Sequence, residues 1–287
     1  MTLDIQINQS LEKALGYGLK DPCPAKLKSA LKYAVLPGGA RVRPKLCLSV
    51  AHACAPQADH SDAMAAAAAL ELLHCASLVH DDLPCFDDAD LRRGKPTVHT
   101  KYGENLAVLT GDALIVLAFE CLARDAKTYF RELTLVFTEA TAPPNGIAAG
   151  QAWESEAEID LEAYHNAKTA ALFIAAARAG AASVGANDQD WRELGTNLGL
   201  AYQIADDLRD AVLTTHELGK PAKQDARNYR PSAVETYGLD EAYKKLRAAI
   251  DAAAASVPVC AGSDSLRQLI FAQAVRLTPD HLVQDVA

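Results

Sequence analysis

The sequence lacks several features that would place it in other classes of protein. No apolar run reaches the roughly 18 to 20 residues of a membrane span, so we expect no transmembrane segment. The first ten residues, MTLDIQINQS, lack the basic and apolar regions of a secretory signal, and we expect a cytoplasmic protein. No linker rich in Pro, Gly or Ser divides the chain, so residues 1–287 are expected to form a single domain.

Cysteines and basic residues are too few, or wrongly spaced, for two further classes. The seven cysteines are odd in number and contain no CxxC pair, which argues against a zinc site and a disulfide framework. Reduced, mostly buried thiols are predicted instead. The net charge is −9, with 28 Lys and Arg against 37 Asp and Glu, and no basic stripe rises above that balance. We therefore expect no nucleic-acid partner.

Alternation of helix and strand patterns is also missing, and β-branched runs are few, which argues against an α/β fold. Half of the residues are hydrophobic. Residues 61–80 form a long Ala-rich pattern, and residues 106–123 are apolar around most of a helix, as in the centre of a bundle. The sequence predicts an all-α bundle around a deep apolar cavity. It contains no Ser/His/Asp or Cys/His constellation for nucleophilic catalysis.

Charged residues concentrate in one stretch, residues 71–96. Two adjacent aspartates, Asp81 and Asp82, end an apolar helical run, where buried carboxylates need partners. Pro84 disfavours helical geometry at the residue before it, and the resulting bulge can bring Asp87 back toward Asp81. Converging carboxylates suit Mg²⁺, which prefers oxygen ligands and completes its shell with substrate phosphates.

Two arginines, Arg92 and Arg93, follow these carboxylates directly. Guanidinium groups bind phosphate through two parallel hydrogen bonds. Residues 71–96 therefore supply both halves of a metal and diphosphate site. A solvated acidic turn with a basic tail is the alternative interpretation of this stretch alone.

A second acidic cluster favours the site over the solvated turn. Its members, at positions i, i+3, i+4 and i+7 of a helical pattern, share one helix face: Gln203, Asp206, Asp207 and Asp210. Like charges at this spacing destabilise a bare helix. Two acidic clusters that each end a buried helix are best explained if they face one another across a cavity with metal ions between them. The acidic run 154–162, by contrast, is expected to be a solvated face and helix start rather than a metal site.

These two clusters resemble motifs of a known family, the trans-isoprenyl diphosphate synthases or polyprenyl synthetases. Residues 81–93 resemble the first aspartate-rich motif in its longer form, and residues 206–210 resemble the second; the match runs from residue 38 to about residue 231. The resemblance implies an Mg²⁺-dependent homodimer that condenses isopentenyl diphosphate with dimethylallyl, geranyl or farnesyl diphosphate. In such enzymes the allylic diphosphate leaves, and the double bond of isopentenyl diphosphate attacks the resulting cation.

The resemblance also assigns residues to four tasks. The metal-ligand candidates are Asp81, Asp82, Asp87, Asp206, Asp207 and Asp210. The allylic diphosphate is expected on Arg92, Lys168, Thr169, Gln203 and Lys220. Isopentenyl diphosphate is expected on Gly39, Arg41, Arg43, His74 and Arg93. The residues expected to act in catalysis are Asp81, Asp82, Asp87, Arg92, Lys168, Asp206, Asp207 and Lys220.

Two segments depart from the family pattern. Ala40 stands where a lysine is expected, and Arg41 is the candidate to compensate for it. In residues 220–231, Lys223 and Gln224 replace the usual second glycine and lysine. We expect this segment to be a mobile lid whose closure excludes water.

Product length is expected to depend on the helix before Asp81. The resemblance places a chain-length residue at Ala76, with small Ser77 beside it, while larger side chains lie deeper: Leu73, Leu70 and Phe119. At 1.5 Å per residue, Leu70 lies roughly 16 Å below Asp81. An open upper turn above a closed lower one predicts geranylgeranyl diphosphate, with farnesyl diphosphate as the runner-up.

Two other functions remain as alternatives. A class I terpene cyclase shares the metal and diphosphate chemistry, but usually has an Asn/Ser/Glu metal motif where this chain has DDLRD. It would also not need a second diphosphate site. A non-catalytic partner subunit is suggested by Ala40 and the altered residues 220–231, whereas two intact aspartate clusters argue against it.

Overall fold

Helices form most of the described chain in this computed structural model, in which residues 2–36, 38–212 and 232–277 are described. The all-α prediction is confirmed. The α-helices are α1 (Leu3–Gly18), α2 (Ala25–Val35), α3 (Val42–Cys54), α4 (Ser61–Asp81), α5 (Val98–Tyr102), α6 (Glu104–Asp125), α7 (Phe130–Thr141), α8 (Ile147–Ala152), α9 (Leu161–His165), α10 (Ala171–Ala182), α11 (Arg192–Val212), α14 (Ala233–Tyr237), α15 (Leu239–Ala255) and α16 (Ser263–Leu277).

Shorter elements join these helices. Two are 3-10 helices, η1 (Trp153–Ser155) and η3 (Asp188–Trp191), and one is a π-helix, η2 (Asn166–Ala170). Strands β1 (Leu91–Arg92) and β2 (Lys95–Pro96) form an antiparallel hairpin. The hairpin follows α4 and carries the first arginine of the acidic stretch.

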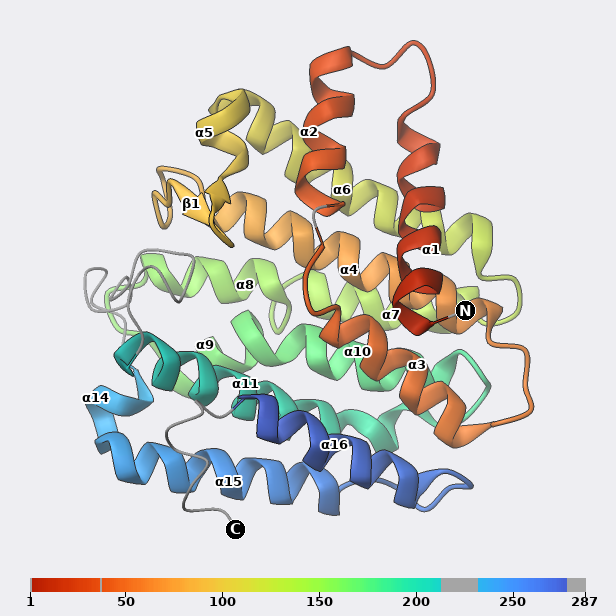
Figure 1. The fold of residues 1–287 in the computed structure, drawn as a ribbon, viewed down its shortest axis with the longest axis vertical. Coiled ribbons are helices and arrows are strands. Elements are labelled where there is room, and N and C mark those ends of the chain that lie inside the picture. The colour runs from red at the N-terminus through yellow and green to blue at the C-terminus, as the bar shows by residue number, and fades with distance from the viewer. Residues whose placement is uncertain (1, 37, 213–231, 278–287) are drawn as a thin grey trace.

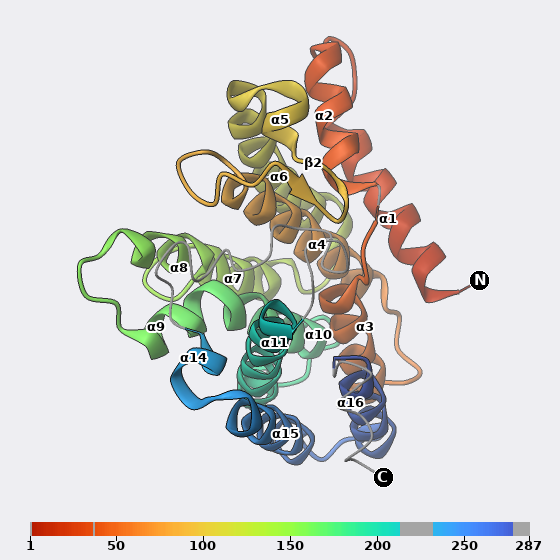
Figure 2. The ribbon, with the colours of Figure 1, turned by 60° about the vertical axis from the view of Figure 1, so that its left-hand side comes forward.

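The long helices lie side by side across the molecule, whereas α1 and α2 stand across them (Figure 1). Helix α4 packs against α3 and α6, and α10 packs against α3 and α11. Helix α15 covers the outer side of α11, and Figure 2 shows both of these helices nearly end-on. Each long helix therefore has neighbours on more than one side, as expected for a bundle.

Alanine lets the central helices approach closely. Residues 65–69 of α4 and 175–177 of α10 are buried alanines, which favour helix and add little bulk. At Gly180 the approach is closer still, because a Cβ there would lie 2.4 Å from the backbone oxygen of Cys47 on α3. This packing holds α4 and α10 close together in the core of the bundle.

Two helices are long and apolar enough to cross a membrane by length and composition alone. Helix α4 has a mean hydropathy of 1.4, and 72% of its most apolar 18-residue segment is buried. Helix α6 has a mean hydropathy of 2.0, and 44% of the corresponding segment is buried. They correct the premise that no apolar run is long enough. A buried core helix of a soluble protein passes the same test, so this finding carries no argument for a span. The expected absence of a transmembrane segment stays a prediction.

All seven cysteines are free thiols, as predicted. Cys47, Cys75 and Cys121 are buried, and burial raises the pKa of each thiol to about 12. Cys85 is exposed. Burial is therefore less general among the thiols than the sequence suggested.

Candidate functional site

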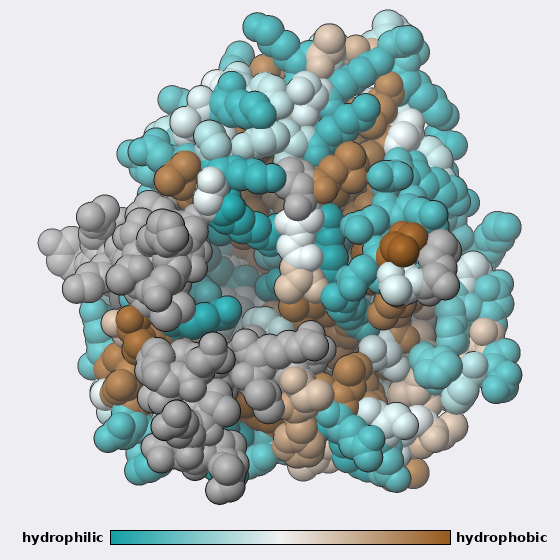
Figure 3. Space-filling model, viewed as in Figure 1, coloured by the Kyte–Doolittle hydropathy of each residue, from teal (hydrophilic) through white to brown (hydrophobic). Residues whose placement is uncertain are grey.

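A cavity of about 310 Å³ opens between the C-terminal parts of α4 and α11. The predicted site residues that line it are Arg43, His74, Ser77, Asp81, Asp87, Arg92, Lys168, Thr169, Gln203, Asp206 and Asp210. Apolar side chains such as Ile147 and Leu172 share the lining. The face drawn in Figure 3 is hollowed near its centre, and hydrophilic residues lie along part of the edge of the hollow.

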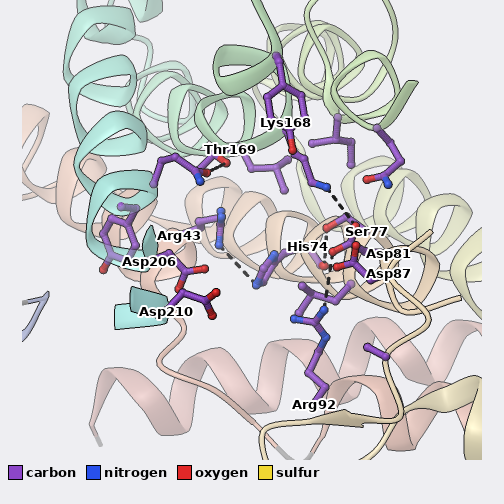
Figure 4. Close-up of a pocket in the computed structure, with 18 of the residues that line it drawn as sticks. Arg43, His74, Ser77, Asp81, Asp87, Arg92, Lys168, Thr169, Asp206 and Asp210 are labelled. Atoms are coloured by element: carbon purple, nitrogen blue, oxygen red, sulfur yellow. Dashed lines mark hydrogen bonds and ion pairs between the residues drawn. The ribbon is translucent and has the colours of Figure 1, made fainter. Parts of the chain in front are cut away.

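The two acidic clusters lie on different sides of this cavity. In Figure 4, Asp81 and Asp87 lie on one side and Asp206 and Asp210 on the other. Arg43 and His74 lie between them. The structure thus brings together the ends of two helices that are far apart in the sequence, as the two motifs predicted.

The first cluster converges through a backbone turn after α4. The amide of Asp87 donates a 2.9 Å hydrogen bond to the carbonyl of Asp81, and the amide of Asp88 donates to Leu83 at 3.1 Å. Asp88 has a left-handed φ of 47°, which aspartate tolerates better than most residues. The turn at Pro84 therefore places Asp81 and Asp87 on the same side of the cavity.

A third carboxylate, Glu154 of η1, joins these two. Oxygens of Asp81, Asp87 and Glu154 lie within 4.8 Å of one another. Lys168 Nζ lies 3.2 Å from Asp81 Oδ1 and also contacts Glu154, which accepts a 2.9 Å hydrogen bond from the Tyr164 hydroxyl. The expectation that Glu154 belongs to a solvated face is therefore wrong. An all-oxygen donor set of this kind fits Mg²⁺.

Lys168 and Thr169 reach the cavity from the π-helix η2, directly before α10. Gly150 allows this geometry, because a Cβ there would lie 2.4 Å from the Lys168 amide nitrogen. Single π-turns often occur at functional sites. The Thr169 hydroxyl donates a 2.5 Å hydrogen bond to Gln203 and so links η2 to α11.

Asp82 does not line this cavity. It is 3% exposed and accepts hydrogen bonds from Arg92 Nε at 2.8 and 2.9 Å, while Arg92 Nη2 lies 2.7 Å from Asp82 Oδ1. Although burial lowers the pKa of Arg92, these contacts raise it above its ordinary value. Asp82 therefore orients Arg92. This position differs from the prediction that Asp82 is a metal ligand.

Asp207 is likewise turned away. Its carboxylate accepts hydrogen bonds from Gln203 Nε2 at 2.9 Å and from the Ala233 amide at 2.7 Å, and the residue is 3% exposed. It therefore holds Gln203 and the start of α14 in place. Adjacent residues on a helix point in directions about 100° apart, and here Asp206 lines the cavity whereas Asp207 faces the start of α14.

Arg43 and His74 form a half-buried cationic part of the cavity. Arg43 Nη1 lies 3.4 Å from His74 Nε2, and the Arg43 guanidinium lies 4.5 Å from the ring centre of Phe173. Burial, followed by the charge of Arg43, holds the pKa of His74 well below its usual range. His74 is therefore neutral near neutral pH and can accept or donate a hydrogen bond.

Gly39 and Arg93 meet beside this cavity. Arg93 Nη1 donates a 2.6 Å hydrogen bond to the carbonyl of Gly38, and a Cβ on Gly39 would lie 2.6 Å from the same nitrogen. Arg93 lines a smaller neighbouring cavity of about 130 Å³ together with Gly38 and Arg92. Arg92 lines both cavities and so connects them.

Arg41 does not serve as the expected substitute for a lysine at position 40. Its guanidinium is buried, forms a 2.5 Å ion pair with Glu71, and donates a 2.7 Å hydrogen bond to the carbonyl of Val35. Both side chains of the ion pair are less than 5% exposed. The prediction that Arg41 compensates for Ala40 is therefore corrected: Arg41 belongs to the core.

Of the described residues expected to set product length, Ser77 alone lines the main cavity. Ala76, Leu73 and Leu70 are fully buried on α4, and Phe119 packs against the same core. Ala76 faces the core because the cavity-facing side of α4 carries His74, Ser77, Leu78 and Asp81. The geometry therefore favours Ser77 as the residue that limits product length at the upper end of the cavity.

Lys220 and the expected lid, residues 220–231, lie outside the described residues. Sequence reasoning did not assign Tyr202 or Arg209, although both line the cavity beside the second motif. The sequence feature that could have identified them is their position on α11, where Tyr202 directly precedes Gln203 and Arg209 directly precedes Asp210. Glu154 could have been found from the segment 150–154, which resembles a family segment that faces the site.

Comparisons with known proteins agree with this geometry. Residues 24–262 match the family model for polyprenyl synthetase. The chain is 52% identical to geranylgeranyl diphosphate synthase of Cereibacter sphaeroides over 97% of this chain and 98% of that relative. It is 50% identical to the enzyme of the same name from Rhodobacter capsulatus, over 94% of each chain. Its fold is similar to a geranyltransferase from Helicobacter pylori, crystallised with magnesium and isoprenyl diphosphate, with a TM-score of 0.79, 28% identity and coverage of 96% and 99%.

Proposed function

The chain belongs to the polyprenyl synthetase family, and on that basis we propose that it is a magnesium-dependent prenyltransferase that makes geranylgeranyl diphosphate. Its substrates are isopentenyl diphosphate and a shorter allylic diphosphate. The observation that carries the proposal is the single cavity lined by two acidic clusters and by several cations. Two relatives at half identity or more bear the name of this activity.

Metal binding is proposed at Asp81, Asp87 and Glu154, whose oxygens lie within 4.8 Å of one another. Asp206 and Asp210 would complete the metal-binding side of α11, since both line the same cavity. Mg²⁺ bound there would supply positive charge to the leaving diphosphate. The carboxylates would place this positive charge close to the Arg92 and Lys168 side chains.

The allylic diphosphate is proposed to bind Arg92, Lys168 and the Thr169–Gln203 pair. Asp82 holds Arg92 in one orientation through its hydrogen bonds, so little ordering is required when substrate arrives. As the allylic carbon–oxygen bond breaks, negative charge grows on the departing diphosphate, and these donors stabilise it. Apolar residues such as Leu172 shield the resulting cation from water.

Isopentenyl diphosphate is proposed to bind at Arg43, His74 and Arg93. Its double bond then attacks the allylic cation, a carbon–carbon bond forms, and the departed diphosphate takes up the released proton. The neutral state of His74 suits a hydrogen bond with a phosphate oxygen or with Arg43. Gly39 leaves space for Arg93 beside this site.

A homodimer is proposed from an apolar surface on α6 and α7. Val108, Leu109 and Val116 of α6 are 42%, 52% and 65% exposed, and Phe130 and Leu135 of α7 are also exposed. Exposed apolar side chains of this number on adjacent helices are typical of an interface. A single domain is proposed because one core cluster includes residues from α1 through α16. The cytoplasmic location stays a prediction.

The test is to incubate the purified protein with Mg²⁺, labelled isopentenyl diphosphate and dimethylallyl, geranyl or farnesyl diphosphate. The proposal expects label in geranylgeranyl diphosphate, and none when EDTA removes the metal. A terpene cyclase would instead convert an allylic diphosphate to hydrocarbon without isopentenyl diphosphate. A non-catalytic partner subunit would incorporate no label with any primer, and that result would refute the proposal.

A further inference from the structure

The cations of the main cavity divide into two groups. Arg92 is bound to Asp82, and Lys168 contacts Asp81 and Glu154, so both are neutralised by carboxylates of the first acidic cluster. Arg43 and Arg209 line the same cavity, and the only carboxylate that an ion pair joins to either of them among the described residues is the exposed Asp206, beside Arg209. Among the described residues Arg43 forms no ion pair, and its Nε has no hydrogen-bond partner.

Arg209 is held loosely by its own helix. Its Nε donates a 3.1 Å hydrogen bond to the carbonyl of Ala205, and its Nη2 lies 3.5 Å from Asp206 Oδ1. The side chain is 33% exposed. Five N–H donors are available on a guanidinium, and these two contacts leave most of them for a ligand.

Tyr202 lines the main cavity together with Arg43 and Arg209. Burial raises the pKa of the Tyr202 hydroxyl, and the charges of Arg43 and then Arg209 lower it. Phe173 stacks on Tyr202 with ring centres 4.5 Å apart and also lies under Arg43. The Phe173–Tyr202 pair therefore supports Arg43 in the cavity that Arg209 also lines.

A second cavity, of about 400 Å³, lies behind this side. Tyr202 and Arg209 line both cavities, and Ala40 and Lys45 line the second one. Arg209 thus stands at the boundary, close to the turn whose residue 40 carries no charge. Arg41 supplies no cation there, because it is paired with Glu71 in the core.

We propose that Arg209 binds the diphosphate of isopentenyl diphosphate together with Arg43, and supplies the positive charge that Ala40 lacks. The inference rests on the proposed function and adds a residue to its second substrate site. A diphosphate that is not held by metal needs cations that are not already neutralised by carboxylates. In the main cavity Arg43 has no carboxylate partner among the described residues, and the one carboxylate that Arg209 contacts, Asp206, is 53% exposed and 3.5 Å away, so these two cations are the least neutralised there.

The test compares Arg209→Gln, which removes the charge and keeps polarity, with the wild-type protein. Steady-state kinetics should show KM for isopentenyl diphosphate raised roughly 10- to 100-fold, the range for a lost hydrogen bond to a charged group. KM for the allylic substrate should change little. Lys45→Gln is the matched control, because Lys45 lines the second cavity but not the main one, and pairs with exposed Asp4. It should leave both KM values unchanged.

Rescue separates a binding role from a structural one. The double variant Ala40→Lys with Arg209→Gln returns a cation to the same boundary, and should recover most of the affinity. Calorimetric titration of isopentenyl diphosphate into metal-free protein gives the same comparison without turnover. Unchanged affinity in Arg209→Gln, an equal rise in both KM values, or no rescue by Ala40→Lys would overturn the inference. A wild-type protein that makes no prenyl product would instead refute the proposed function.

Discussion

Lys168 Nζ lies 3.2 Å from Asp81 Oδ1, and the same ammonium group contacts Glu154. One cation thus offsets the repulsion between two carboxylates that share a site. Metal ions at these carboxylates would take over this task and leave Lys168 to bind the diphosphate. The lysine is therefore a counter-ion of the first acidic cluster, and under the proposed function it also serves the allylic site.

Replacing Lys168 by Met, which keeps the length of the side chain and removes the charge, should weaken binding of the allylic substrate. Loss of one hydrogen bond to a charged phosphate predicts a rise in its KM of roughly 10- to 100-fold. KM for isopentenyl diphosphate should stay within a few-fold of wild type. Lys13→Met, on the surface beside Asp125, is the control. An unchanged allylic KM would remove Lys168 from the site.

The sequence predicts the elements of this fold well because their signals are local. The Ala-rich pattern of α4 and the turn after Pro84 are encoded within a few residues. Glu154 was misjudged because its partners, Asp81 and Lys168, come from other elements, and only the folded chain brings them together. Acidic spacing alone also could not separate Asp206, which faces the cavity, from Asp207, which faces α14.

Arg41 and Glu71 form a buried ion pair, so removing one partner should leave an uncompensated charge in the core. Arg41→Met is expected to lower the free energy of unfolding by about 3 to 5 kcal/mol. Replacing both partners, Arg41→Met with Glu71→Leu, should restore most of that loss. Urea unfolding measures both values, with the partly exposed Arg124–Glu120 pair as a control expected to cost under about 1 kcal/mol. Near-equal losses at the two pairs would contradict the buried assignment.

His74 should make the protein less stable in mild acid. Because its pKa is well below 6.5 in the folded state, the unfolded chain binds a proton there that the folded protein does not. Stability should therefore fall as the pH drops below about 6.5, by at most about 1.4 kcal/mol per pH unit from this residue. His74→Gln should remove that part of the slope. Denaturant unfolding at several pH values tests this, and identical slopes for both proteins would show that His74 is not the cause.

Ser77 and Ala76 offer a matched pair for testing what limits product length. Ser77 lines the cavity, whereas Ala76 is buried in the core beside it. Ser77→Phe should fill the upper part of the cavity and shift the main product from geranylgeranyl to farnesyl diphosphate. Ala76→Phe should lower stability through overpacking, by about 1 to 3 kcal/mol. If Ala76→Phe shortens the product and Ser77→Phe does not, the residues that limit product length lie on the other side of α4.

The central claim is that carboxylates on opposite sides of one cavity hold the allylic diphosphate through Mg²⁺. Calorimetric titration of geranyl diphosphate, without isopentenyl diphosphate, tests it directly. We predict tight binding with Mg²⁺, a large loss of affinity in EDTA, and a similar loss with Mg²⁺ present when Asp81 or Asp206 is replaced by Ala. Equally tight binding with and without Mg²⁺ would contradict the claim.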